Sequence, residues 1–220
     1  MNALILGANG SGKSVYAEKY ISRFSRGALY YAATMIPYGK EGIARIEAHR
    51  AQRAALEFIT VEKPFCVSEI PFTPGASVLL EDVSNLLANA LFENDGNGGN
   101  GFSKFEKDGN GGNGFSEIDE CVYSGIFGNA NSSIAGDVYS KIAEVIFLDI
   151  TAMCGKCANA VLVSINGLTA MPEYDEETRR FIYELNKLNA RLFEYADVVI
   201  SMRGGEAFIE KGNLPHGNIF

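Results

Sequence analysis

Eight residues near the amino terminus carry the clearest chemistry in this sequence. Residues 7–14 read Gly-Ala-Asn-Gly-Ser-Gly-Lys-Ser, which satisfies the pattern G-x-x-x-x-G-K-[ST] of a phosphate-binding loop. Glycines at this spacing let successive backbone N–H groups turn toward one phosphate, and the start of the following helix adds partial positive charge. Lys13 would reach the β- and γ-phosphates, and the Ser14 hydroxyl would bind Mg²⁺. We therefore predict a nucleotide site that contains Gly7, Ala8, Asn9, Gly10, Ser11, Gly12, Lys13 and Ser14.

A second group of candidates is a pair of carboxylates at the end of an apolar run. Residues 77–82 read Ser-Val-Leu-Leu-Glu-Asp. In proteins with a phosphate loop, a neighbouring strand ends in an acid that holds Mg²⁺ directly or through water. Glu81 or Asp82 is therefore the candidate metal acid. Asp149 also ends an apolar run, but the sequence around it keeps a helical period from 133 to 153, which favours a buried helix there.

A histidine among arginines is the third candidate. Between about residues 40 and 56, apolar residues and arginines recur at helical intervals, which predicts a polar helix that carries His49 beside Arg45, Arg50 and Arg53. A neutral imidazole is a competent nucleophile near pH 7, and nearby guanidinium groups could neutralise charge on a transferring phosphate. From the residues alone, His49 is either such a nucleophile or an ordinary surface histidine.

The four cysteines are too few and too scattered for a disulfide framework. Residues 154–157 spell C-x-x-C, which would suit a redox pair or half of a zinc site. A zinc site needs two further ligands, and the chain has only two histidines, neither paired with another ligand. We interpret Cys154 and Cys157 as incidental cysteines at the end of a helix.

Alternating strand and helix patterns must position these groups. Strands are expected over residues 3–6, 28–34, 58–62, 77–82, 158–165 and, as the final strand, 196–202. Helices are expected over 15–24, 40–56, 133–153 and 175–195. Thr34 should end the second strand with its hydroxyl facing a loop. This order predicts an α/β fold of the P-loop NTPase (RecA-like) class: a mostly parallel sheet with helices on both faces and the phosphate site at the carboxyl ends of the strands.

Length and composition predict a single nucleotide-binding domain over residues 1–220. The chain is 47% hydrophobic with a net charge of −8, so it can bury a core but offers no clustered Lys/Arg surface for nucleic acid. No apolar run approaches the roughly 18 residues of a membrane span, and no signal pattern opens the chain, so we expect a cytoplasmic protein. Residues 95–103 recur word for word as 108–116, which predicts a solvated low-complexity insert over about 93–120.

The order of these motifs resembles one enzyme family. The resemblance rests on the phosphate loop, residues 30–34 and R-I-x-x-H-R at 45–50, and on Glu62, residues 79–81, 161–164 and 172–198. The phosphate loop is generic, whereas R-I-x-x-H-R at this distance from it is specific. Apart from the insert and the last dozen residues, nearly the whole chain is similar to the bifunctional adenosylcobinamide kinase / adenosylcobinamide-phosphate guanylyltransferase family.

The resemblance implies two reactions of cobalamin biosynthesis at one phosphate site, with GTP and ATP as substrates and Mg²⁺ as cofactor. First, a γ-phosphate passes to the aminopropanol hydroxyl of adenosylcobinamide. Second, a histidine, matched here by His49, attacks the α-phosphate of GTP, and the GMP then passes to adenosylcobinamide phosphate. In some relatives a neighbouring helix position carries the nucleophile. The family also suggests a homotrimer.

By the same resemblance, particular residues take particular roles. Lys13 and His49 would be catalytic, and Ser14 and Glu81 would hold the metal. Glu62 and Glu81 would reach the guanosine or the metal. The other nucleotide-binding residues would be Ala33, Thr34, Arg50 and Arg53.

Two departures from the family pattern bear on the activity. The family usually has arginine where this chain has Gly10. It also has Asn-Glu-Val-Gly where this chain has Ile-Asn-Gly-Leu at 165–168, so Asn166 replaces a glutamate. If that acid activates the cobinamide hydroxyl, phosphorylation is impaired while guanylylation survives. Two alternatives remain: a kinase for another small alcohol, which would have no use for His49, and a degenerate module that binds GTP without turnover.

Overall fold

A seven-stranded sheet forms the centre of the computed structural model, which describes residues 1–36, 44, 47, 51, 56–92 and 141–213. The strand order is β3-β2-β4-β5-β1-β6-β7. The strands are β1 (Asn2–Gly7), β2 (Leu29–Ala33), β3 (Ile59–Glu62), β4 (Ser77–Glu81), β5 (Asn159–Ile165), β6 (Val198–Arg203) and β7 (Glu206–Lys211). The helices are α1 (Lys13–Phe24), α3 (Val83–Phe92), α6 (Ile142–Cys154) and α7 (Glu176–Tyr195), with a 3₁₀ turn η2 (Val67–Glu69).

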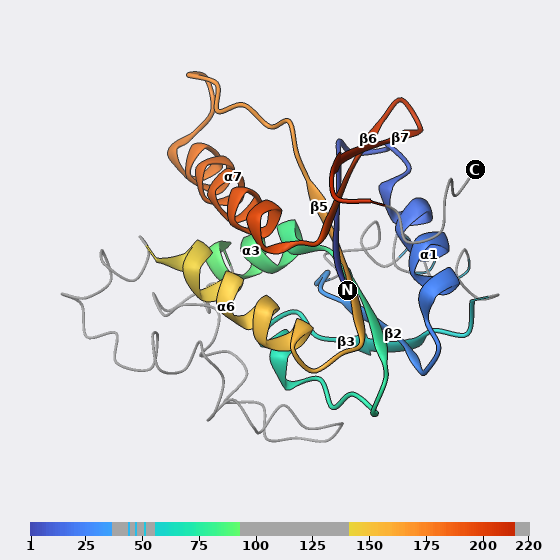
Figure 1. Cartoon of the computed structure of the whole chain (residues 1–220). Coiled ribbons are helices and arrows are strands. Elements are labelled where there is room, and N and C mark those ends of the chain that lie inside the picture. The colour runs from blue at the N-terminus through green and yellow to red at the C-terminus, as the bar shows by residue number, and fades with distance from the viewer. Residues whose placement is uncertain (37–43, 45–46, 48–50, 52–55, 93–140, 214–220) are drawn as a thin grey trace, which may run out of the picture.

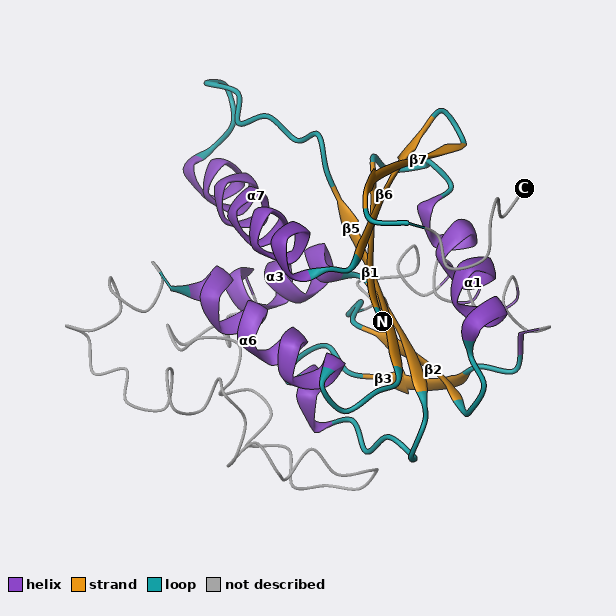
Figure 2. Ribbon diagram, in the orientation of Figure 1, coloured by secondary structure: helices purple, strands orange, loops and turns teal. Residues whose placement is uncertain are grey.

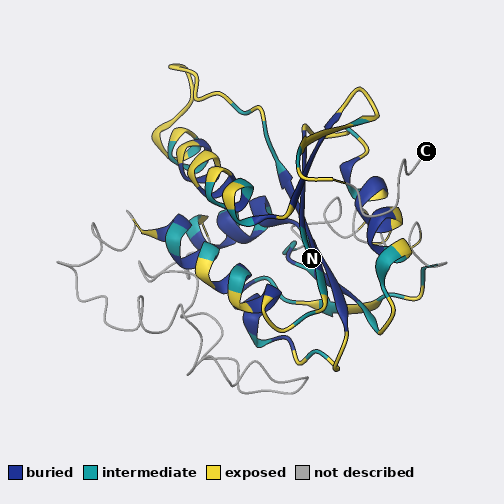
Figure 3. Cartoon of the chain, in the orientation of Figure 1, coloured by how far each residue is buried: buried dark blue, intermediate teal, exposed yellow. Residues whose placement is uncertain are grey.

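The sheet separates two helical layers, as the fold prediction requires. Helix α1 covers one face, and α3, α6 and α7 cover the other (Figures 1 and 2). Strand β1 shows why: Ala3 and Ile5 pack in the cluster with α1, whereas Leu4 and Leu6 pack in the cluster with the three other helices. Because β1 is buried on both faces (Figure 3), its sequence is continuously apolar rather than alternating. The prediction of a mostly parallel sheet with helices on both faces is confirmed.

The sheet does not end at β6, so the prediction that residues 196–202 form the final strand is wrong. Strand β7 pairs antiparallel with β6 across a two-residue turn, in which Gly204 and Gly205 have φ of 58° and 85°. This is the conformation that favours Gly-Gly in tight hairpins. The residues of β7 are exposed or half-buried, so its sequence carries no apolar face, and the Gly-Gly pair was the available signal.

Helix α3 is a second element that the sequence interpretation did not include. Six of its ten residues are buried, among them Leu86, Leu87 and Ala90, so the segment reads as an apolar run with weak periodicity. Strand β3, at the other edge of the sheet, is mostly exposed rather than half-buried.

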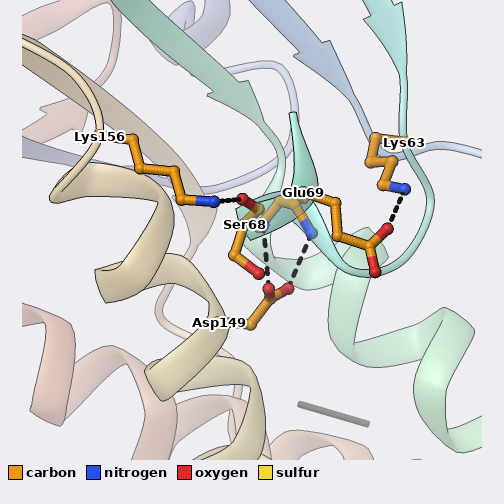
Figure 4. A network of polar contacts seen from close by, with 6 residues as sticks. Lys63, Ser68, Glu69, Asp149 and Lys156 are labelled. Atoms are coloured by element: carbon orange, nitrogen blue, oxygen red, sulfur yellow. Dashed lines mark hydrogen bonds and ion pairs between the residues drawn. The ribbon is translucent and has the colours of Figure 1, made fainter. Parts of the chain in front are cut away.

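The connection from β3 to β4 is anchored to α6 by a polar network (Figure 4). The Asp149 carboxylate accepts hydrogen bonds from the backbone N–H groups of Val67 and Ser68, both at 2.9 Å. Lys156 Nζ donates to the Ser68 carbonyl at 2.5 Å, and Lys63 pairs with Glu69 at 2.5 Å. Asp149 therefore stabilises η2 from within a helix, which agrees with the helical interpretation of this segment.

The described cysteines differ in state. Cys66 forms a disulfide, which the sequence analysis did not expect. Cys154 and Cys157 are free thiols at the end of α6, and burial raises the pKa of each thiol to about 12. Such thiols stay protonated and unreactive at neutral pH, which supports their interpretation as incidental.

Helix α7 is amphipathic and begins at Asp175. The Asp175 side chain accepts a hydrogen bond from the backbone N–H of Thr178 at 2.6 Å, and Glu176 and Glu177 occupy the first turn, where the helix dipole favours negative charge. Among the residues that the structure describes, no helix is both long and apolar enough to cross a bilayer.

Candidate nucleotide site

The phosphate loop lies between the carboxyl end of β1 and the start of α1, as predicted. Gly10 and Gly12 have φ of 73° and 83°, a backbone region that side chains disfavour. A Cβ atom at Gly7 would lie 2.3 Å from Ser11 Oγ, so the loop folds closely on itself. These positions explain the glycine spacing in the sequence.

Lys13 lies inside this loop rather than in solvent. Its side chain is buried, and its Nζ donates to the Ala8 carbonyl at 3.4 Å. The ammonium group therefore lies against the backbone of the loop, where it has a weak neutral acceptor that an anionic oxygen could replace.

The Ser14 hydroxyl meets the end of β4 directly behind the loop. Ser14 Oγ donates to Glu81 Oε1 at 2.6 Å. The other carboxylate oxygen, Glu81 Oε2, is buried and has no hydrogen-bond partner among the described residues. Burial and the nearby Asp82 raise the pKa of Glu81 to about 8, against the opposing effects of Ser14 and Lys13. A hydroxyl and a carboxylate with a spare oxygen suit Mg²⁺, which binds one or two protein oxygens and completes its shell with water and phosphate.

Asp82 has a different environment from Glu81, to which it is joined by a cis peptide bond. Its Oδ1 accepts hydrogen bonds from Ser84 Oγ at 2.6 Å and from the Asn85 backbone at 2.7 Å. Asp82 therefore caps the start of α3. Burial raises the pKa of its carboxyl above the usual range. Glu81 accepts a hydrogen bond from the phosphate loop, whereas Asp82 interacts with the loop through the charge of Lys13, which lowers its pKa against the effect of burial.

Thr34 is buried, so the prediction that its hydroxyl faces a loop is wrong. The hydroxyl accepts from the Asp82 backbone N–H at 2.8 Å and donates to the Asp82 carbonyl at 2.8 Å. The Thr34 backbone N–H also donates to the Glu81 carbonyl at 3.1 Å. These bonds tie the end of β2 to the end of β4, because a buried hydroxyl must find partners and the strand ends supply them.

Ala33, Glu62 and Glu81 lie in one row across the sheet. Ala33 pairs in register with Glu62 of β3 on one side and with Glu81 of β4 on the other. Parallel strands place their carboxyl ends at one edge, so the structure brings these three residues to the same end of the sheet as the phosphate loop. Glu62 is exposed there.

The structure does not describe the predicted nucleophile or the arginines predicted to act beside it. His49, Arg50 and Arg53 lie outside the described residues, as does the repeated segment 93–120. Of the predicted polar helix, four residues are described: Ala44, Glu47 and Ala51 are α-helical and exposed, and Leu56 is in a 3₁₀ turn and half-buried. The roles of His49, Arg50 and Arg53 stay predictions.

Two buried asparagines lie beside the site, and neither was predicted as a site residue, although Asn189 belongs to the segment that carries the family resemblance. Asn89 of α3 donates from Nδ2 to the Thr34 carbonyl at 2.7 Å. Asn189 of α7 accepts from Ser164 Oγ at 2.7 Å and donates to the Ile165 carbonyl at 2.8 Å. A single amide on the buried face of a helix was the only signal available for either residue.

Two solved structures illustrate the weak structural similarity of the chain to other proteins. They are the flagellar accessory protein FlaH from Methanocaldococcus jannaschii and the RadB recombinase. Their identities are 14% and 12%, and the TM-score is 0.37 for each. The aligned regions cover 96% and 99% of this chain and 78% and 84% of those chains. Scores this low add nothing to the argument, so the P-loop NTPase fold rests on the loop and the sheet described above.

Sequence comparison gives a more specific result. No curated protein matches the chain significantly. The family model described as cobinamide kinase / cobinamide phosphate guanyltransferase, however, matches residues 3–208. Because this match spans nearly the whole chain, the protein belongs to the cobinamide kinase / cobinamide phosphate guanyltransferase family of transferases.

Proposed function

We propose that this protein phosphorylates adenosylcobinamide and transfers GMP from GTP to adenosylcobinamide phosphate through a guanylyl-histidine on His49, giving adenosyl-GDP-cobinamide. The observation that carries the nucleotide part is the 2.6 Å contact between Ser14 and Glu81 directly behind the phosphate loop. Family membership supports the choice of cobinamide as acceptor.

The phosphate loop and Lys13 would bind the triphosphate. On binding, Lys13 Nζ exchanges the Ala8 carbonyl for phosphate oxygens, which are stronger acceptors because they are charged. Ser14 and Glu81 would hold Mg²⁺, which, when bound, neutralises charge on the phosphate oxygens. Glu81 must release its proton to serve as a ligand, since its pKa is raised to about 8.

His49 would carry the guanylyl group. A neutral imidazole nitrogen attacks the α-phosphorus of GTP, forming an N–P bond while the bond to the bridging oxygen breaks and pyrophosphate leaves. A phosphate oxygen of adenosylcobinamide phosphate then attacks the same phosphorus. The N–P bond breaks, and the imidazole is restored. Arg50 and Arg53 would stabilise the negative charge that develops on the transferring phosphate.

The kinase half depends on the end of β5. The backbone N–H of Asn166 donates to the Gly7 carbonyl at 3.4 Å, so Asn166 stands beside the phosphate loop at the position where the family has glutamate. An asparagine amide cannot accept the proton of an attacking hydroxyl. We therefore propose that phosphorylation of adenosylcobinamide is slow in this protein relative to guanylylation.

Covalent labelling tests the proposal. The protein is incubated with Mg²⁺ and GTP labelled on the α-phosphate, denatured, and assayed for bound label that is labile to acid and stable to alkali. The wild type should carry label and His49→Ala should not. His216 is the only other histidine in the sequence, so His216→Ala is the matched control and should label normally.

The labelling result also separates the alternatives. An unlabelled wild type that transfers the γ-phosphate to another small alcohol would be a kinase of a different kind. An unlabelled wild type that binds GTP without turnover would be a degenerate module. The homotrimer implied by the resemblance remains a prediction that light scattering can test.

A further inference from the structure

Asn89 occupies an unusual position for an amide. It lies on α3 among apolar residues and is only 7% exposed. Its Nδ2 donates to two carbonyls, that of Thr34 at 2.7 Å and that of Pro64 at 3.0 Å. Thr34 follows directly after β2, and Pro64 lies two residues after the end of β3. The amide group therefore donates hydrogen bonds to residues just after the ends of two neighbouring strands.

A continuous chain of hydrogen bonds leads from this amide to the phosphate loop. Asn89 binds the Thr34 carbonyl, and the Thr34 backbone N–H binds the Glu81 carbonyl at 3.1 Å. The Thr34 hydroxyl holds the next residue, Asp82, through both its N–H and its carbonyl. The Glu81 side chain then accepts from Ser14. Every link before this last one involves a backbone group, so a shift at Asn89 is passed on to Glu81.

We propose that Asn89 is a positioning residue, which sets Glu81 in place for Mg²⁺ by fixing the end of β2, the strand that lies between β3 and β4. This inference rests on the proposed function, because it takes Glu81 as the metal acid. The physical reason is the cost of leaving a buried carbonyl without a donor. Without Asn89, the Thr34 and Pro64 carbonyls must move to find partners, and Glu81 moves with Thr34.

A merely structural role for Asn89 would have a different effect. If the amide only stabilised α3, its loss would lower the unfolding free energy and would weaken GTP binding equally with and without Mg²⁺. If it positions Glu81, the contribution of the phosphate loop to GTP binding survives and the contribution of Mg²⁺ is lost. The readout is therefore the ratio of the GTP dissociation constants in EDTA and in Mg²⁺.

The experiment measures equilibrium GTP binding by full-length wild type, Asn89→Leu and Asn89→Gln. Leucine keeps the approximate volume and removes both donors, whereas glutamine restores an amide. Loss of groups that orient a metal ligand typically costs about 10- to 100-fold in metal affinity, so Asn89→Leu should need that much more Mg²⁺ to enhance GTP binding. Asn89→Gln should recover part of the difference.

Asn159→Leu is the matched control. Asn159 Nδ2 also joins two strands, through Ser77 Oγ at 3.1 Å, but it does so at the starts of β5 and β4, the opposite end of the sheet from the phosphate loop. Its Mg²⁺ enhancement should equal that of the wild type. If Asn89→Leu does not fold, Asn89→Ala tests the same link, because alanine also removes both amide donors and is well tolerated in a helix.

The outcomes are distinct. A selective loss of Mg²⁺ enhancement in Asn89→Leu, or in Asn89→Ala where the leucine variant does not fold, supports the inference. An unchanged enhancement, or an equal loss of GTP affinity in EDTA and in Mg²⁺, overturns it. If the wild type itself shows no Mg²⁺ enhancement, the metal site of the proposed function fails, and this inference fails with it.

Discussion

Replacing Glu81 with glutamine should change how stability depends on pH. In the folded protein the pKa of Glu81 is raised from 4.5 to about 8, so the folded state holds this proton more tightly than the unfolded chain does. The resulting stabilisation is complete below pH 4.5 and is lost as pH rises toward about 8. Glutamine is neutral throughout this window and removes the dependence.

The expected size follows from proton linkage. Between its unfolded and folded pKa values, a group that is protonated only in the folded state lowers the unfolding free energy by about 1.4 kcal/mol for each unit that the pH rises. From pH 4.5 to about pH 8, the loss attributable to Glu81 therefore reaches at most about 5 kcal/mol. This is a large part of the roughly 5 to 15 kcal/mol that stabilises a typical domain.

Urea unfolding at several pH values, in EDTA, measures the effect. The wild type should lose several kcal/mol more than Glu81→Gln between the two ends of the window. The exposed Glu173→Gln removes one carboxylate elsewhere and should follow the wild type. Parallel pH profiles for wild type and Glu81→Gln would refute the argument, since they would mean that Glu81 titrates alike in the folded and unfolded states.

Three further substitutions test other parts of the structure. Asp149→Ala leaves two buried N–H groups of η2 without an acceptor and should lower the unfolding free energy by about 3 kcal/mol in urea titrations; a loss no larger than that of a surface mutation would contradict the anchoring role. Asp175→Ala removes the cap of α7 and should lower the urea midpoint by less than Asp149→Ala does, with unchanged GTP labelling. Asn166→Glu should accelerate γ-phosphate transfer to adenosylcobinamide and leave guanylylation of the protein unchanged; equal kinase rates would show that this position does not limit phosphorylation.

The buried strands and the phosphate loop could be predicted from the sequence because each leaves a local pattern. Strands β1, β4 and β5 are continuous apolar runs, and the loop has fixed glycine positions. Helix α3 and strand β7 left weaker patterns, since one is apolar on nearly all sides and the other is largely exposed. Local patterns locate an element when it is a short apolar run bounded by turn residues or when one of its faces differs from the other.

The site was harder to predict because its side chains bind residues that are distant in the sequence. The strand pattern left Glu81 and Asp82 open, and the family resemblance favoured Glu81; in the structure the two differ in their contacts with Ser14 and with the start of α3. Thr34 was expected to face a loop, but it binds residues 48 positions further along the chain. Asn89 gave only the weak signal of a single amide within an apolar run. Polar side chains that serve the backbone of another element cannot be recognised before the fold brings them together.

The in-register row of Glu62, Ala33 and Glu81 fixes the distance between the two glutamates. Adjacent strands lie about 4.8 Å apart, so the two glutamate backbones are separated by about 10 Å, two intervals of the sheet. Backbone hydrogen bonds set the spacing between neighbouring strands, so a side-chain substitution does not change it. Substituting aspartate for glutamate shortens the side chain at either position but leaves the backbone separation unchanged. A ligand that contacts both acids must therefore fit a distance that the strand spacing fixes.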